Sequence, residues 1–236
     1  MLFRSGQEDE LFFEQFAGAP LLRQGWTTDR RAISRAVANV NPTGGTALYD
    51  AVAEALPVAA EGRNTKKAVL VISDGNDTNS RVSAGALRQQ IRESEVMVYA
   101  LGVDGTETQT RQQPRVQQPP PRIPLPFPIP GTGGRRRSPI PGLPQIGNGG
   151  WMRMPGERVN ADALRQITDD TGGRTEIVRG FGDLDGATAR IADELSRQYY
   201  LGYASNGKKD GGWHTIRVEV GNRAYTVRAR RGYTAS

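Results

Sequence analysis

A proline-rich stretch in the middle of the chain limits which residues can form a folded core. Residues 105–158 contain 12 of the chain's 15 prolines. Because proline has no backbone N–H and a fixed φ angle, such a stretch cannot extend a helix or a sheet. We therefore expect residues 105–158 to be a disordered, exposed insertion with some polyproline II character. It divides one domain into residues 1–104 and 159–198, and we expect residues 199–236 to add a β extension.

The formal net charge of +6 comes from the same insertion. Residues 105–158 contain 8 Arg and 2 Glu, whereas the rest of the chain is close to neutral. The run Arg135-Arg136-Arg137 could attract a polyanion such as a nucleic acid or a membrane surface, and we keep this as the alternative function. The insertion has only two aromatic residues, Phe127 and Trp151, so base stacking has little to use. A solvated loop is therefore the favoured interpretation, and nucleic acid is not an expected partner.

Cysteine and histidine usage excludes several kinds of site. The chain has no Cys and one His. It therefore cannot form disulfides, thiolate metal sites or multi-histidine zinc sites. Its longest strongly apolar run, Ala68–Ile72, is too short for a transmembrane helix. The acidic residues 8–10 argue against a secretory signal in the first residues.

Strand and helix patterns alternate along the first part of the chain. The continuous apolar run Ala68–Ile72 predicts a parallel strand that is covered on both faces. The full pattern predicts, in chain order, strands at 11–16 and 20–25, helices from Asp29 (capped by Thr28) and at 47–60, a strand at 68–73, a helix capped by Ser83, and a strand at 96–101.

The second part continues this alternation and then changes period. From His214 to Ala229, apolar residues alternate with polar ones around Gly221-Asn222, which predicts an antiparallel β-hairpin. Before it we expect a helix capped by Asn160 and ended by Gly172-Gly173, a strand over Arg174–Val178, and a helix that begins at Asp183.

The alternation of strands and helices indicates the fold class. It is typical of an α/β fold with a doubly wound, mostly parallel, Rossmann-like sheet. The C-terminal antiparallel hairpin is an addition to that sheet. We expect Tyr199, Tyr200 and Tyr203 to pack between the last helix and this hairpin.

Two polar segments are expected at one edge of the sheet, where ligands bind in open α/β folds. Asp74 follows the strand at 68–73, and Thr46 precedes the helix at 47–60. Gly44-Gly45 would let the backbone approach a ligand closely. A carboxylate and a hydroxyl suit a hard cation such as Mg²⁺. In the competing interpretation Thr46 is only a helix cap and Asp74 only a turn residue.

Several motifs together resemble the von Willebrand factor type A (VWFA) domain. The first two are Gly-Gly-Thr-Ala-Leu-Tyr-Asp-Ala at 44–51 and Val-Leu-Val-Ile-Ser-Asp-Gly-Asn-Asp at 69–77. More narrowly, the chain is similar to the bacterial VWFA-related proteins abundant in Acidobacteria. Those also carry a Thr-Gly-Gly-Arg stretch (here 171–174), a Gln-Tyr-x-Leu-Gly-Tyr stretch (198–203) and a closing Val-Arg-Ala-Arg stretch (227–230). The match covers the whole chain outside the insertion.

The resemblance implies a metal-ion-dependent adhesion site that is incomplete here. In the family, the site combines an Asp-x-Ser-x-Ser sequence, a Thr and an Asp, and the last two match Thr46 and Asp74. The chain contains no Asp-x-Ser-x-Ser, so we expect Mg²⁺ or Mn²⁺ to bind weakly or not at all. The candidate ligands and the predicted binding loop comprise Gly44, Gly45, Thr46, Asp74, Gly75, Asn76 and, as a further candidate ligand, Asp77.

The resemblance also implies that the family's first strand is missing. That strand lies in the middle of the sheet, between the strands seen here at 11–16 and 68–73. Its absence would leave unpaired backbone groups at two buried edges, at about 1–3 kcal/mol each. Either residues 11–16 pair directly with 68–73, or the chain comes from a truncated gene model, and the resemblance favours the second.

These observations predict a protein–protein interaction or adhesion module rather than an enzyme. The partner would be a protein, ideally bound through a shared divalent cation. Relatives of this kind act outside the cytoplasm, so the resemblance implies an extracytoplasmic location. A hydrolase is the least favoured hypothesis, because the only histidine, His214, lies on the late hairpin and away from Ser73 and Asp74.

Overall fold

The computed structural model describes residues 8–40, 44–104, 159–202, 210–222 and 224–235. The predicted insertion at 105–158 lies outside these residues, as does Tyr203. Within the described part, no helix is long and apolar enough to cross a membrane. The elements are, in chain order, β1 (Leu11–Phe16), β2 (Pro20–Thr27), α1 (Arg30–Ala38), α2 (Leu48–Ala60), β3 (Ala68–Ser73), α3 (Ala84–Glu93), β4 (Met97–Val103), α4 (Ala161–Thr168), the 3-10 turn η2 (Asp169–Thr171), β5 (Thr175–Val178), α5 (Phe181–Ser196), β6 (Trp213–Thr215) and β7 (Gly232–Thr234).

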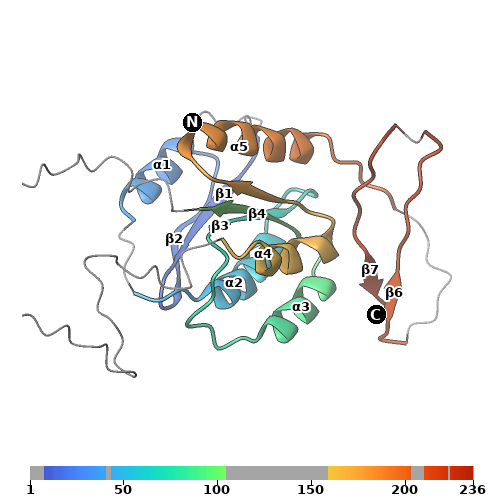
Figure 1. Cartoon of the computed structure of the whole chain (residues 1–236), viewed down its shortest axis with the longest axis horizontal. Coiled ribbons are helices and arrows are strands. Elements are labelled where there is room, and N and C mark those ends of the chain that lie inside the picture. Colours follow the sequence, from blue (N-terminus) through green and yellow to red (C-terminus); the bar gives the residue numbers. More distant parts are fainter. Residues whose placement is uncertain (1–7, 41–43, 105–158, 203–209, 223, 236) are drawn as a thin grey trace, which may run out of the picture.

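A parallel sheet of three strands, in the order β3-β4-β5, forms the centre of the molecule. Helix α5 covers one face of this sheet, and α2, α3 and α4 cover the other (Figure 1). Helices on both faces of a parallel sheet make a doubly wound α/β fold. The predicted fold class is therefore confirmed.

The core consists of two apolar clusters, one on each face of the sheet. The larger one joins α2, α3 and α4 to the sheet and includes the fully buried Leu48, Leu87 and Leu164. The smaller one lies under α5, where Tyr99 of β4 packs with Ile191. Because β4 supplies side chains to both clusters, a nearly continuous apolar sequence is what this strand needs.

Strand β3 departs from its prediction on one face. Val69 and Val71 are buried in the larger cluster, but Leu70 and Ile72 are 38% and 55% exposed. Helix α5 packs on β4 and β5, so it does not extend over this end of the sheet. The apolar run therefore predicted the strand correctly, whereas its predicted burial on both faces is wrong.

Strands β1 and β2 form an antiparallel hairpin of their own, which lies against α1 and α2. The Trp26 indole donates to the Val58 carbonyl of α2 at 3.2 Å, and its ring packs edge-on against Phe12 at 4.9 Å. Among the described residues, β1 pairs with β2 and with no strand of the central sheet. Direct pairing of residues 11–16 with 68–73 is therefore wrong, since the two strands belong to different sheets.

The structure confirms two predicted helix caps and moves a third by one residue. The Ser83 hydroxyl accepts from the Ala86 N–H at 3.2 Å, and the Asn160 side chain accepts from the Ala163 N–H at 3.1 Å. The cap of α1 is Asp29 rather than Thr28. Its carboxylate accepts from the Arg31 N–H at 2.8 Å, and its backbone is extended, as a capping residue requires.

The C-terminal hairpin is shorter than its alternating pattern predicted. Ladder pairing joins only Trp213–Thr215 to Gly232–Thr234. On either side of position 223, the Tyr225 N–H donates to the carbonyl of Asn222, one of the two predicted turn residues, at 3.2 Å. Alternation specifies the strand character of this segment, but the turn itself depends on backbone hydrogen bonds that the pattern does not reveal.

The residues after α5 do not pack as expected. Tyr199 and Tyr200 are 91% and 71% exposed, so their predicted packing between the last helix and the hairpin is wrong. The side chain that reaches inward is Gln198, whose amide donates to the Tyr99 hydroxyl at 2.9 Å. Burial raises the pKa of Tyr99 to about 12. Since Gln198 occupies the inner position, the two tyrosines that follow it are left facing solvent.

Candidate functional site

The carboxyl ends of β1 and β3 meet the start of α2 at one edge of the molecule. After β1, the Ala17 carbonyl accepts from the Ala47 N–H at 2.7 Å. Just before α2, the Thr46 carbonyl accepts from the Thr78 and Asn79 N–H groups at 2.8 and 3.0 Å. Residues 44–50 and 73–80 therefore lie side by side, and we call these two segments the carboxyl edge. They contain all of the predicted site residues.

Asp77 closes the start of helix α2. Its Oδ1 accepts from the Leu48 N–H at 2.8 Å and from the Ser80 hydroxyl at 2.5 Å. The Tyr49 N–H also reaches this oxygen, at 3.3 Å. A carboxylate at a helix start satisfies free N–H groups and complements the helix dipole. The cap of α2 thus comes from a residue far along the chain.

Thr46 is held through its backbone. Its N–H donates to the Thr78 hydroxyl at 2.9 Å, and its carbonyl accepts the two bonds described above. No hydrogen bond within the described residues uses its own hydroxyl. The structure gives Ala47 as the N-cap residue of α2, so Thr46 is not the cap, and its half-buried side chain stays available at the edge.

Asp74 forms the turn that follows β3. Its two carboxylate oxygens accept from the Asn76 N–H at 3.0 Å and from the Asn76 side-chain amide at 3.1 Å. Its carbonyl accepts from the Asn160 N–H at 2.7 Å, which ties the turn to the start of α4. These contacts are the ones expected if Asp74 acts as a turn residue.

Two of the three site glycines, Gly45 and Gly75, serve close packing within the protein. A Cβ on Gly75 would lie 2.6 Å from the Asn160 carbonyl oxygen and 2.8 Å from the Leu164 side chain, and its φ of +80° also favours glycine. A Cβ on Gly45 would lie 3.2 Å from the Thr78 hydroxyl. Gly44 has a φ of +95°. The close approach that the glycines permit is thus to α4 and to residues 78–79.

Electrostatic interactions strengthen the same edge. The Asp50 carboxylate accepts from the Arg81 and Val82 N–H groups at 2.8 to 3.0 Å, which anchors the loop after β3 to α2. Hydrogen bonds from Val82 and then Arg81 lower the pKa of Asp50. Burial raises the pKa of Tyr49, and the charge of Asp77 raises it further. Asp50 therefore stays ionised and Tyr49 neutral near pH 7.

The donor set at the carboxyl edge does not fit a Mg²⁺ or Mn²⁺ site. Asp77 gives Oδ1 to the start of α2, and Asp74 gives both oxygens to Asn76. In the part of the chain that the structure describes, no three Asp, Glu, His or Cys side chains come together. Because Mg²⁺ needs about six oxygen ligands in an octahedral arrangement, one hydroxyl and engaged carboxylates do not hold it.

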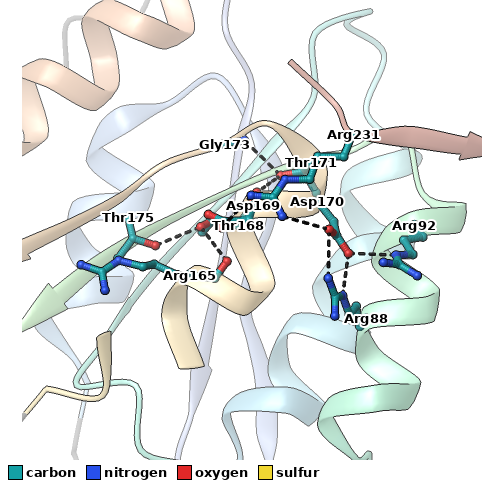
Figure 2. A network of polar contacts seen from close by, with 10 residues as sticks. All are labelled: Arg88, Arg92, Arg165, Thr168, Asp169, Asp170, Thr171, Gly173, Thr175 and Arg231. Carbon is teal, nitrogen blue, oxygen red and sulfur yellow. Dashed lines mark hydrogen bonds and ion pairs between the residues drawn. The ribbon is translucent and has the colours of Figure 1, made fainter. Parts of the chain in front are cut away.

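The sequence did not indicate a second polar centre, at the opposite end of α4. Asp170 has a side chain only 2% exposed. It accepts from Arg88 Nε at 2.7 Å and from Arg92 Nε at 2.8 Å, both on α3 (Figure 2). Arg231 lies 3.8 Å from it and also pairs with Asp169 at 2.9 Å. We call these five residues the Asp170 network.

The charge of Asp170 follows from these contacts. Burial opposes its ionisation, but the hydrogen bonds and charges of Arg88 and Arg92 outweigh burial and lower the pKa of Asp170. The same contact raises the pKa of Arg88. Two sequence features could have indicated the Asp170 network. They are the spacing of four residues between Arg88 and Arg92 on α3 and the Asp-Asp pair before Thr171.

The Asp170 network adjoins a tight seam between the turn after α4 and the C-terminal segment. Gly172 has a φ of +81°, and a Cβ there would lie 2.5 Å from the Ala229 backbone. A Cβ on Gly173 would overlap the Val98 carbonyl oxygen. The Thr-Gly-Gly-Arg and Val-Arg-Ala-Arg stretches of the sequence resemblance therefore pack against each other.

His214 lies within the C-terminal strands. Its Nε2 is 3.0 Å from Asp210 Oδ1, and its ring stacks on Tyr233 at a centroid distance of 5.4 Å. The hydrogen bond from His214 and one from the Gly212 N–H lower the pKa of Asp210. The pair stabilises the short β6–β7 ladder.

Solved structures with a similar arrangement include two proteins from Bacteroides. The conserved hypothetical protein BatB from Bacteroides thetaiotaomicron matches with a TM-score of 0.51 at 19% identity, over 81% of this chain and 82% of that chain. An aerotolerance-related membrane protein from Bacteroides fragilis, with multiple mutations to serine, gives 0.50 at 19% identity, over 81% of each chain. A von Willebrand factor type A structure from Catenulispora acidiphila gives 0.49 at 15% identity, over 79% of this chain and 34% of that chain.

Comparison of the sequence with known proteins does not assign the chain to a family. No protein-family model matches the chain, and no curated protein matches it. At 19% identity the two Bacteroides likenesses show the fold and nothing further. The chain therefore shares its doubly wound α/β fold with BatB and the aerotolerance-related protein, across most of the length of all three.

Proposed function

We propose that this chain is a von Willebrand factor type A-like module that binds a protein partner at its carboxyl edge, without a resident divalent cation. The supporting observation is the hydrogen-bonded joining of residues 44–50 to 73–80, which unites the two motifs of the sequence resemblance in one surface. Open α/β sheets bind their ligands at this edge. Recognition by a binding module, rather than catalysis, needs only such a surface.

The composition of the edge favours a protein as the partner. Ile72, which is 55% exposed, stands next to Ser73 and Asp74 at the end of β3. Gly44 and Gly45, in the chain segment that leads into α2, are also exposed. Protein interfaces combine apolar side chains with a rim of hydrogen-bonding groups. An apolar side chain next to polar loops supports such an interface.

The cation-free part of the proposal rests on the contacts of the two aspartates. Both Asp74 and Asp77 are committed to intramolecular hydrogen bonds. A partner's carboxylate would therefore meet the Thr46 hydroxyl instead of a shared metal ion. Such hydrogen bonds give specificity without a requirement for Mg²⁺.

Site-specific photo-cross-linking tests the location of the binding surface. A photoreactive amino acid replaces Thr46, and the matched control replaces Thr65, an exposed threonine between α2 and β3 at the other end of the sheet. We expect a discrete protein adduct from position 46 in extracts of the source organism, and none from position 65. The adduct should also form when EDTA is present before irradiation. Equal labelling at both positions, or no adduct at position 46, contradicts the proposal.

Calorimetry tests the metal part separately. We expect no micromolar binding of Mg²⁺ or Mn²⁺ by the 1–236 chain. Micromolar binding that Thr46→Ala or Asp74→Asn abolishes would overturn the cation-free mechanism and restore a metal site at the edge. We also propose the extracytoplasmic location that the resemblance implies, and cell fractionation with an antibody against the chain tests it.

A further inference from the structure

A cavity lies between helix α3 and the C-terminal strands, apart from the carboxyl edge. Its volume is about 350 Å³, at the lower end of the range for ligand pockets, which is roughly 300–1,000 Å³. Its lining includes Gly85, Arg88 and Arg92 from α3, and Gly211, Trp213 and Thr234 from the C-terminal segment. The cavity thus depends on the docking of the C-terminal segment against α3.

The two arginines keep free hydrogen-bond donors beside this cavity. Their bonds to Asp170 use Nε and Nη2 of Arg88 and Nε of Arg92. Each guanidinium has five N–H donors in a planar fork. Among the described residues, Nη1 of Arg88 and both Nη atoms of Arg92 have no hydrogen-bond acceptor. The cavity therefore has unused donors of the kind that bind carboxylates in pairs.

The contacts of both side chains hold these donors in place. Asp170 holds the Nε atoms of the two guanidiniums at 2.7 and 2.8 Å, so the two groups lie side by side. The guanidinium of Arg92 also stacks over the Trp213 ring at 4.8 Å. A pair of arginines held in this way loses little side-chain freedom when an anion binds, which favours affinity.

The balance of charge around the cavity is positive. Arg88 and Arg92 line it, and the one acidic residue in its lining, Glu93, has Oε1 engaged by the Gln89 amide at 3.0 Å. The charge of Asp170 is buried behind the arginines and is shared with Arg231. An incoming carboxylate would face two guanidiniums and one carboxylate, Glu93, whose Oε1 already accepts a hydrogen bond from Gln89.

We propose that this cavity binds a carboxylate side chain of an acidic protein segment, through the outward donors of Arg88 and Arg92 and against the Trp213 ring. The inference rests on the proposed role of the chain as a protein-binding module and adds a second contact point to it. The planar guanidinium pair already binds one carboxylate, that of Asp170, through its inner side. Binding of a second one through the outer side repeats the same chemistry.

Fluorescence anisotropy with a labelled oligoglutamate peptide tests the proposal on the full chain. Gly85 lines the cavity, and a Cβ there would meet nothing within 4 Å, so we chose Gly85→Trp to place a large side chain at the cavity. Gly182 is the matched control, because it is also the second residue of a helix, α5, and its Cβ would also meet nothing within 4 Å. We expect Gly85→Trp to weaken peptide binding by at least about tenfold, and Gly182→Trp to leave it unchanged.

A second pair of variants tests the charge requirement. Gly85→Asp places a negative charge at the cavity and should weaken binding, whereas Gly182→Asp should not. Glu93→Gln removes the one acid from the lining and should strengthen binding severalfold. Circular dichroism and the unfolding midpoint show whether each variant is folded. An oligolysine peptide should bind none of the variants.

Three outcomes would overturn the proposal. If Gly85→Trp and wild type bind oligoglutamate equally, the peptide binds elsewhere, for example at the arginine-rich residues 135–137. If inorganic phosphate competes as well as free glutamate does, the site accepts small anions in general and not an acidic segment. If Gly182→Trp weakens binding as much as Gly85→Trp, the effect is not local. Cross-linking at Thr46 is independent of all three, so failure at the carboxyl edge and failure at the cavity give different results.

Discussion

Replacing Asp170 by asparagine removes the negative charge that holds α3, the turn after α4 and the C-terminal segment together. Asp170 is 2% exposed and accepts charged hydrogen bonds from Arg88 and Arg92 at 2.7 and 2.8 Å. Loss of one partner from a fully buried ion pair costs about 3–5 kcal/mol. Here the three arginines are 34% to 56% exposed, so water can solvate them when the carboxylate is gone. We therefore expect Asp170→Asn to lower the free energy of unfolding by about 2–3 kcal/mol.

The matched control is the neighbouring residue. Among the described residues, the Asp169 side chain forms its one ion pair with Arg231, at 2.9 Å, and it is 44% exposed. Exposed ion pairs contribute about 0–1 kcal/mol, so Asp169→Asn should change the free energy of unfolding by about 0.5 kcal/mol or less. Urea unfolding followed by circular dichroism measures both variants. Tryptophan fluorescence reports on Trp213, which stacks on Arg92 and should lose its docked signal in Asp170→Asn.

The pH dependence of the free energy of unfolding provides a second test of the Asp170 network. The pKa of Asp170 is lowered in the folded protein, so its ionic contacts stabilise the fold above the ordinary Asp pKa near 3.8. This contribution is lost as the pH falls below that value through the lowered folded pKa. Wild type should therefore lose stability on acidification more steeply than Asp170→Asn. Equal effects of the two variants near pH 7, together with equal acid slopes, would refute the assignment of the Asp170 network as the main link.

Three further predictions concern Glu14, Gly173 and Asp77. Burial and then the Glu54 charge raise the pKa of Glu14 to about 7, so its ionisation destabilises the fold as the pH rises from about 4.5 through 7. Glu14→Gln should add about 1–2 kcal/mol to the free energy of unfolding at pH 8, allowing for partial solvent screening, and nothing at pH 4. Gly173→Ala should lower the free energy of unfolding by about 3 kcal/mol or more, as measured by thermal unfolding, because the alanine Cβ would overlap the Val98 carbonyl oxygen. Asp77→Ala should cost about 1–2 kcal/mol through loss of the α2 cap.

Each of these predictions has a control within the chain. Gly25→Ala should be nearly neutral, because a Cβ there would meet nothing within 4 Å. Asp77→Asn keeps the Oδ1 acceptor and should retain most of the cap. A Glu14→Gln variant with the same pH profile as wild type would show that Glu14 is ionised in both the folded and the unfolded chain.

The order of helices and strands could be predicted from the sequence because it depends on local patterns. The apolar runs at β3 and β4, and the side chains of Ser83 and Asn160, act within a few residues of themselves. The doubly wound fold class followed from their alternation. The predicted cap Thr28 is wrong by one residue, because Thr28 and Asp29 can both cap a helix and the structure uses Asp29.

The role of the candidate site residues stays a prediction, but their contacts could not be predicted from the sequence. Thr46 and Asp77 lie at one edge, where Thr46 contacts Thr78 and Asp77 contacts the start of α2, and Asp74 forms the turn just before Asp77. Their hydrogen bonds, however, join them to one another's loops and to α2. Spacing along the chain shows which residues come near each other, but not whether a carboxylate faces a ligand or a helix start.

By itself, the sequence determined the alternation of helices and strands, and with it the fold class. Only the tertiary structure decided that one face of β3 is uncovered and that β1 pairs with β2 alone. It alone also brought Asp170 to Arg88 and Arg92, which lie 82 and 78 residues away along the chain. The physical reason is range: helix caps and apolar periods act over a few residues, whereas the burial of a charge depends on every segment packed around it.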